Sequence, residues 1–98
     1  MIFRRRTLAH SSAPVAVILY TKPDCTLCER ARTHLTRLQG RFPHTLTLVD
    51  ITNDPSLFER YKYVIPVLVI DGSEYPAPLT PPVLERALAN AIRGGGGV

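Results

Sequence analysis

The sequence predicts an α/β domain in which the order β-α-β-α-β-β-α forms a mixed four-stranded sheet with helices on both faces. Three patterns predict this class. A short apolar run over residues 15–20 precedes an amphipathic stretch over residues 25–39. An alternating segment follows at residues 45–50, and Asp71-Gly72 later separates two strand-like segments. With 98 residues, the chain has the size of one domain.

The first predicted strand covers residues 15–20, where apolar side chains occupy both faces, as in a central strand that helices cover on both sides. After a turn at residues 21–24, a helix is predicted from Cys25 to Gln39. Its apolar residues recur at helical spacing and predict one buried face, formed by Leu27, Ala31, Leu35 and Leu38. Gly40 stands where a left-handed C-cap would end this helix.

Residues 45–50 alternate between polar and apolar, which predicts a half-buried strand near a sheet edge. Because a helix separates this strand from the first one, the two are predicted to run parallel as a βαβ unit. Asn53-Asp54-Pro55 combines a capping side chain with a proline at the first helical position, which predicts a short helix to Lys62. Phe58 and Tyr61 form its apolar side.

The last third of the domain predicts a β-hairpin and a helix. Residues 67–70 and Glu74-Tyr75 flank Asp71-Gly72, which is a strong signal for a two-residue hairpin turn. Thr80-Pro81-Pro82 predicts the start of the last helix. The apolar residues of its buried side are Leu84, Ala87, Leu88 and Ala91.

Both ends of the chain are predicted to be flexible tails around a folded domain at residues 15–93. Residues 1–14 contain an arginine triplet and no acidic residue, so an organellar transit segment is the alternative to a basic tail. Residues 94–98 are rich in glycine, which loses much backbone freedom in a helix. Because no apolar secretory core is present, we expect a cytoplasmic protein, or an organellar one if residues 1–14 are a transit signal.

The net charge of +4 does not predict a nucleic-acid partner, because it is confined to one end of the chain. Residues 1–23 carry four basic residues and no acidic one, whereas residues 24–98 carry eight of each. A phosphate-binding surface across the whole fold is therefore not expected. The longest apolar stretches also fall well short of the roughly 20 residues that span a bilayer, so no membrane segment is expected.

The sequence has two cysteines, spaced as Cys25-x-x-Cys28, where the first strand passes into the first helix. The N–H groups and the dipole at a helix N-terminus stabilise a thiolate and lower the pKa of a cysteine thiol from about 8.5 toward 7 or below. Lys22 adds to this effect, whereas Asp24 opposes it. Cys28 lies one turn inside the helix and should be less exposed. We therefore expect Cys25 to attack a disulfide and Cys28 to resolve the product.

Three other interpretations of this cysteine pair are weaker. A structural zinc site needs four ligands, and the histidines at 10, 34 and 44 do not have the spacing of a zinc finger, so no metal is expected. A structural disulfide would close too small a loop to add much stability. Two inert core thiols are the third alternative. A C-x-x-C pair beside a βαβ pattern favours a redox dithiol instead.

The segment Tyr20 to Cys28, together with residues 64–66 and the Asp71-Gly72 hairpin, resembles the glutaredoxin-like branch of the thioredoxin fold. The resemblance covers residues 15–93 and implies a glutaredoxin-type, thioredoxin-like fold. It also implies that Cys25 is the nucleophile, Cys28 the resolving thiol, and Pro66 a cis-proline. The residues that it places at the substrate or glutathione site are Lys22, Tyr20, Leu27, Val64, Ile65 and Pro66.

Two departures from glutaredoxins bear on the substrate. Glutaredoxins typically have Pro-Tyr between the cysteines, and Thr26-Leu27 here removes an aromatic wall. They also carry a Gly-Gly-x-Ser/Thr-Asp stretch that grips the γ-glutamyl end of glutathione. The corresponding residues here are Pro76 to Pro81, with the sequence Pro-Ala-Pro-Leu-Thr-Pro. Half of the glutathione clamp is therefore missing from the expected place.

The expected activity is thiol–disulfide exchange, in which the dithiol reduces a protein disulfide or a glutathione mixed disulfide. The electron donor is glutathione or, alternatively, thioredoxin reductase acting on a redoxin without glutathione specificity. No tightly bound cofactor is expected, and glutathione enters as a co-substrate. A non-catalytic module that holds an iron–sulfur cluster or a partner is the alternative, although Cys28 and the missing clamp count against a cluster.

A substrate disulfide is expected to dock between the Cys25 loop and the Ile65-Pro66 turn, where an unpaired backbone amide and carbonyl would bind it as a short β-pair. Tyr20 and Tyr63 are interpreted mainly as packing residues, with shielding of the disulfide and lining of this groove as their alternatives. His34 is interpreted as a surface histidine. The basic residues on the same helix favour a solvated face over a docking patch: Arg30, Arg37 and Arg41.

Overall fold

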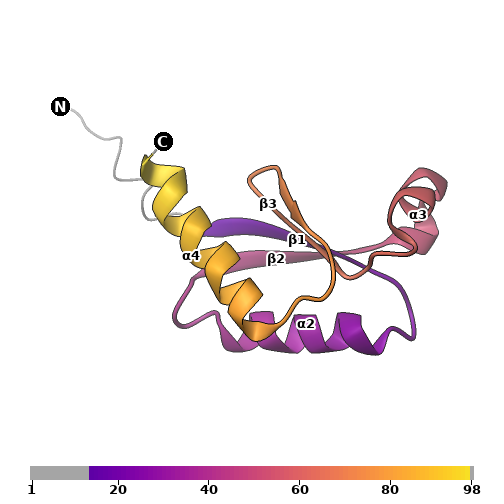
Figure 1. Cartoon of the computed structure of the whole chain (residues 1–98), viewed down its shortest axis with the longest axis horizontal. Helices are drawn as coiled ribbons and strands as arrows, with labels where there is room; N and C mark the ends of the chain where they lie inside the picture. Colours follow the sequence, from indigo (N-terminus) through magenta and orange to yellow (C-terminus); the bar gives the residue numbers. More distant parts are fainter. Residues whose placement is uncertain (1–13, 98) are drawn as a thin grey trace.

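The computed structural model describes residues 14–97 and contains the predicted order of strands and helices (Figure 1). The elements are β1 (Val15–Thr21), α2 (Thr26–Arg37), β2 (His44–Asp50), the 3-10 turn η1 (Ile51–Asn53), α3 (Pro55–Tyr61), β3 (Val67–Ile70), β4 (Ser73–Tyr75) and α4 (Pro81–Gly97). The strand order is β2-β1-β3-β4, with β1 parallel to β2, and with β3 antiparallel to β1 and β4. The mixed four-stranded α/β fold is confirmed.

The two faces of the sheet are covered by different helices, and the alternation of side chains along β1 separates them. Val17 and Leu19 pack with residues of α2 and α4, which lie together on one side of the sheet (Figure 1). Tyr20 joins a smaller cluster with residues of α3. The buried residues of the larger cluster are Val17, Leu19, Ala31, Leu35, Leu38, Leu68, Ile70, Leu79, Leu84, Ala87 and Leu88.

Tyr61, the last residue of α3, holds this helix against the sheet. Its side chain is buried, and its ring stacks on that of Tyr20 with 4.6 Å between the centroids. The Tyr61 hydroxyl donates a hydrogen bond of 2.9 Å to Glu74 on β4, and Arg60 contacts the same carboxylate oxygen at 3.0 Å. Burial, together with the hydrogen bond to Glu74, raises the pKa of the Tyr61 phenol above its usual value.

Local capping places α3 where the sequence predicts it. The Asp54 carboxylate accepts the backbone N–H groups of Ser56 and Leu57, at 2.9 and 3.2 Å, and Pro55 occupies the first helical position. The hydrogen bond from Leu57 holds the pKa of Asp54 below its usual value. This cap ends the chain segment that follows β2 and fixes where α3 begins.

The hairpin turn between β3 and β4 also follows the sequence prediction. Asp71 has a φ of 50° and Gly72 a φ of 80°, so both central residues lie in the left-handed region. Two-residue hairpin loops of this kind need positive φ at both positions, which Asp-Gly supplies at little cost. The hairpin register pairs Ile70 with Ser73 and Leu68 with Tyr75.

Two helix ends differ from their predictions. Helix α2 ends at Arg37 rather than Gln39, and Leu38 caps it in a right-handed conformation with its N–H bonded to the carbonyls of His34 and Leu35. Gly40 therefore has no left-handed capping role. Helix α4 continues to Gly97, so the predicted tail at 94–98 is wrong for residues 94–97, because glycine weakens a helix but keeps its N–H donor.

The predicted basic tail at residues 1–14 lies outside the described residues, except for Pro14. Between residues 14 and 97, no helix combines the length and the apolar character needed to cross a membrane.

The Tyr61 hydroxyl gives a testable link between stability and pH. Because the folded state holds this proton more tightly than the unfolded chain, its stabilising contribution is present below about pH 10 and lost as the pH rises through the folded pKa. We expect Tyr61→Phe to cost about 1 kcal/mol at pH 7 and to weaken the loss of stability above pH 10. Urea unfolding at pH 7 and pH 11 measures both effects. The control is Tyr63→Phe, because Tyr63 is 88% exposed; equal alkaline losses in both variants would contradict the assignment.

Candidate redox site

Cys25 is the N-cap of α2, and its sulfur takes the place of the usual capping oxygen. The residue has an extended backbone conformation, and its Sγ accepts the backbone N–H of Cys28 at 3.2 Å. An N-cap side chain that accepts an N–H of the first turn satisfies one of the donors left free at a helix start. The sulfur of Cys25 therefore lies at the positive end of the helix dipole, where negative charge is stabilised.

Cys25 and Cys28 are joined as a disulfide, with 5.2 Å between their Cα atoms. The two sulfurs differ in accessibility: Cys28 is only 2% exposed and packs on the inner side of α2, whereas Cys25 is partly exposed. An incoming thiolate or disulfide can therefore reach Cys25 first. This asymmetry agrees with the order of attack expected from the sequence.

The loop that leads into Cys25 carries charged side chains of opposite sign. Lys22 and Asp24 are both exposed, and Asp24 has a φ of 60°, in the left-handed region that aspartate tolerates better than most residues. The left-handed conformation of Asp24 turns the chain from β1 into α2, so that Cys25 lies at the start of the helix. A carboxylate so close in the chain to Cys25 opposes formation of the thiolate.

The peptide bond between Ile65 and Pro66 is cis, as the resemblance implies. The backbone around it is more fully hydrogen-bonded than predicted. The N–H groups of Val64 and Ile65 both donate to the Tyr61 carbonyl, at 2.9 and 3.1 Å, and the Val64 carbonyl accepts from Ala77 at 3.2 Å. The expectation of an unpaired amide at Ile65 is therefore wrong, because the turn that ends α3 uses it. Among the described residues, the Ile65 carbonyl has no hydrogen-bond donor.

A cavity of about 180 Å³ lies beside the dithiol, between α2 and the loop that precedes α4. Two of the predicted site residues, Leu27 and Pro66, line it, together with Arg30 and His34 from α2. Its remaining lining residues form the proline-rich loop: Ala77, Pro78, Leu79, Thr80 and Pro81. The cis peptide bond between Ala77 and Pro78 in this loop has no signal in the sequence. The i, i+4 spacing of Arg30 and His34 puts both on one face of α2, and it is the one sequence signal that could have predicted that both line this cavity.

The predicted substrate residues do not all gather around this cavity. Leu27 and Val64 are exposed apolar side chains, at 55% and 40%, as is the neighbouring Tyr63. Tyr20 instead stacks on Tyr61, in the cluster on the α3 face of the sheet, so it has the packing role. Lys22 is exposed in the loop before Cys25.

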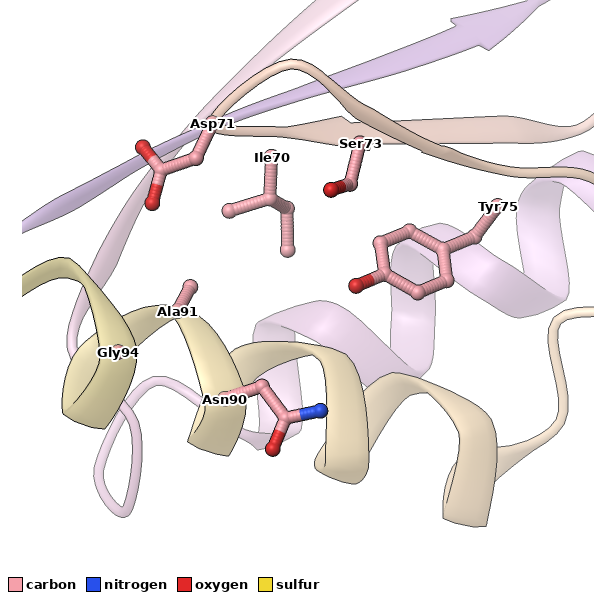
Figure 2. A pocket seen from close by; sticks show the side chains of 7 residues that line it. All are labelled: Ile70, Asp71, Ser73, Tyr75, Asn90, Ala91 and Gly94. Atoms are coloured by element: carbon pink, nitrogen blue, oxygen red, sulfur yellow. The ribbon is translucent and has the colours of Figure 1, made fainter. Parts of the chain in front are cut away.

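A larger cavity, of about 420 Å³, lies away from the cysteines (Figure 2). It is lined by Ile70, Asp71, Ser73, Tyr75, Asn90, Ala91 and Gly94. Because β3 runs antiparallel to β1, the hairpin turn at Asp71 lies at the opposite end of the sheet from the loop that carries Cys25. This cavity therefore does not belong to the redox site. Within the described part of the chain, no group of three or more His, Cys, Asp or Glu side chains is arranged to hold a metal ion.

Comparison with known proteins places the chain in a family. The family model described as "Glutaredoxin-like domain (DUF836)" matches residues 16–93. A structural genomics target protein from X. campestris is 33% identical, with a TM-score of 0.67, over 76% of this chain and 97% of that chain. A protein from Nitrosomonas europaea is 24% identical, with a TM-score of 0.67, over 76% of this chain and 92% of that chain.

The fold extends to thioredoxins. The oxidized form of mitochondrial thioredoxin 3 from Saccharomyces cerevisiae has a TM-score of 0.61 at 21% identity, over 85% of this chain and 84% of that chain. A sulfur-capped helix with a C-x-x-C disulfide and a cis-proline loop thus occurs here on a thioredoxin-like fold. The match over residues 16–93 covers most of the chain. The chain therefore belongs to the glutaredoxin-like domain family.

Proposed function

We propose that the protein is a thiol–disulfide oxidoreductase that reduces protein disulfides or glutathione mixed disulfides through Cys25 and Cys28. The observation that carries the proposal is the position of the Cys25 sulfur, which accepts the Cys28 N–H at the N-terminus of α2 and is partly exposed. A thiol held in this way is prone to ionise, and the thiolate is the form that attacks disulfides. The buried Cys28 beside it supports a role as the resolving thiol.

The reaction has two exchange steps. In the first, the Cys25 thiolate attacks a substrate sulfur; a Cys25–substrate disulfide forms, the substrate disulfide breaks, and the leaving sulfur takes up a proton. In the second, Cys28 loses its proton and attacks the Cys25 sulfur, which releases the second substrate sulfur as a thiol. Two electrons pass to the substrate, and the Cys25–Cys28 disulfide remains. An external dithiol or a pair of glutathione molecules then reduces it.

Docking in this proposal differs from the symmetric β-pair expected from the sequence. The Ile65 carbonyl is available as an acceptor for a substrate N–H, whereas the Ile65 amide is bonded to Tyr61. Leu27 and Val64 offer apolar contacts, Pro66 forms part of the cavity wall, and Lys22 supplies a positive charge beside the attacking sulfur. A substrate that supplies a donor and an apolar neighbour to its disulfide suits this arrangement.

The electron donor is the open choice within the proposal, and the loop before α4 bears on it. Pro76, Pro78 and Pro81 lack the N–H groups that a backbone clamp for a carboxylate requires. This observation favours thioredoxin reductase as the electron donor, and glutathione is the other candidate. A cytoplasmic location fits either donor, because that compartment keeps dithiols reduced.

The first prediction concerns the two cysteines. Cys25→Ser should abolish disulfide reduction, because it removes the attacking sulfur, whereas Cys28→Ser should retain the first step and accumulate the mixed disulfide. Activity on a small disulfide and non-reducing mass spectrometry of the trapped species measure the two outcomes. Turnover by Cys25→Ser at the wild-type rate would sink the assignment.

The second prediction concerns the charge at Asp24. Asparagine also tolerates the left-handed conformation, so Asp24→Asn removes the charge and keeps the backbone. Two unit charges close together in water interact by about 1 kcal/mol, so the pH midpoint of Cys25 alkylation should fall by up to about 0.7 pH units. Cys28→Ser leaves Cys25 as the single thiol for this titration.

The control for the charge effect is Asp71→Asn, because Asp71 is also exposed and left-handed but lies at the far end of the sheet. It should leave the midpoint unchanged. Equal shifts in both variants, or none at Asp24→Asn, would show that Asp24 does not act on the Cys25 thiolate.

The third prediction concerns the electron donor. Because three prolines of the loop before α4 lack a backbone N–H and the Ala77 N–H is bonded to the Val64 carbonyl, we expect thioredoxin reductase with NADPH to reduce the oxidised protein faster than glutathione with glutathione reductase does. NADPH consumption measures both rates on the same oxidised sample. Faster turnover by glutathione would mean that other residues hold glutathione and that the protein is a glutaredoxin in activity.

A further inference from the structure

Three basic side chains form a row on the outer surface of α2, starting two residues after Cys28. They are Arg30, His34 and Arg37, at i, i+4 and i+7, so they share one face of the helix and span about 10 Å. We call this row the α2 ridge. On its inner side lies the 180 Å³ cavity, whose lining includes Arg30 and His34.

A second, more open depression lies along the other side of the α2 ridge. It is lined by Thr26, Glu29, Arg30, Thr33, His34 and Arg37, and it shares Arg30 and His34 with the cavity. The α2 ridge therefore stands between two hollows of the surface, and both begin close to the cysteines. A partner that fills either hollow must contact these basic side chains.

The arginines of the α2 ridge are not neutralised within the described part of the chain. The ion pairs there join Arg41 to Glu85, Arg60 to Glu74, and Lys62 to Glu59, and none includes Arg30 or Arg37. The acidic side chain that shares the ridge surface is Glu29. Lys22 and Asp24, in the loop before Cys25, are exposed side chains of opposite charge, so the excess of positive charge on this side of the redox site comes from Arg30 and Arg37 of the α2 ridge.

We propose that the α2 ridge docks an acidic protein partner of the dithiol, namely a protein whose reactive cysteines are followed by a stretch of Asp or Glu residues. One acidic side chain would enter the cavity beside Arg30 and His34, and others would follow the outer hollow toward Arg37. This inference rests on the proposed function, because it names the class of substrate or donor that meets Cys25.

The dimensions favour a protein over a small anion. A single side chain suits a cavity of about 180 Å³, whereas contacts from Cys25 to Arg37 need a ligand as long as the 12-residue helix α2. A nucleic acid fits less well, since residues 24–98 carry as many acidic as basic residues, and phosphate binding needs an excess of cations. Opposite charges on two proteins raise the rate of association, and salt weakens this effect.

The test uses two synthetic peptides that contain the same Cys-x-x-Cys disulfide, followed by three Glu in one and three Lys in the other. We expect the wild-type protein to reduce the acidic peptide at least about threefold faster at low salt, and this preference to shrink at high salt. Arg30→Gln/Arg37→Gln should lose most of the preference. The matched control, Arg86→Gln/Arg93→Gln, removes two charges from exposed positions on α4 and should keep it.

Two further readouts separate this inference from the proposed function. Reduction of the uncharged bis(2-hydroxyethyl) disulfide reports on the dithiol alone, so each variant's rates with the two peptides are divided by its rate with this substrate. Fluorescence anisotropy with Cys→Ser forms of both peptides reports on docking without exchange, and tighter binding of the acidic peptide should require Arg30 and Arg37. Absence of the uncharged activity in the wild-type protein would overturn the proposed function, whereas equal binding and equal rates of the wild-type protein for the two peptides would overturn the α2 ridge as a docking surface.

Discussion

The hydrogen bond from the Cys28 amide to the Cys25 sulfur is the interaction on which the site depends. It makes Cys25 the N-cap of α2, so the same contact that starts the helix also favours negative charge on the Cys25 sulfur. Helix α2 is in turn held by Ala31 and Leu35, which are buried against the sheet and α4. The hydrophobic core therefore fixes the position of α2, and with it the position of the capping sulfur, relative to the sheet.

The second side of the site depends on Tyr61 rather than on α2. Its ring stacks on Tyr20, its hydroxyl reaches Glu74, and its backbone carbonyl accepts the N–H groups of Val64 and Ile65. One buried residue thus connects β1, β4 and the cis-proline loop on the face of the sheet opposite α2. Because the Ile65 N–H is bonded to Tyr61, it is not free to bind a substrate. The loop is therefore well ordered by the fold but offers a partner fewer backbone groups.

The two walls of the cavity beside the dithiol give the site its chemical character. The proline-rich loop forms one wall and has few backbone N–H donors, whereas the α2 ridge forms the other wall and carries charged side chains. In the proposed docking, recognition of the partner relies less on backbone hydrogen bonds and more on long side chains of a helix. Such contacts act over a larger surface and depend more on ionic strength than a backbone clamp does. This difference supports the proposal that the partner of the dithiol is a protein rather than glutathione.

The sequence by itself determined the order of elements, the hairpin at Asp71-Gly72, the start of α3 at Asp54 and the pairing of Cys25 with Cys28. Each follows from local physics, namely side-chain periodicity, capping or turn conformation, which involves residues close in the chain. Only the tertiary structure decided that the Ile65 amide is occupied, that Tyr20 packs on Tyr61, and that Arg30 and His34 face the proline-rich loop. The stacking of Tyr20 on Tyr61 and the position of Arg30 and His34 beside the proline-rich loop join segments that are distant in the sequence and meet only when the sheet and helices pack, so no local pattern encodes them. The Ile65 amide is bonded only four residues back, to Tyr61, but by a turn that the sequence pattern did not signal.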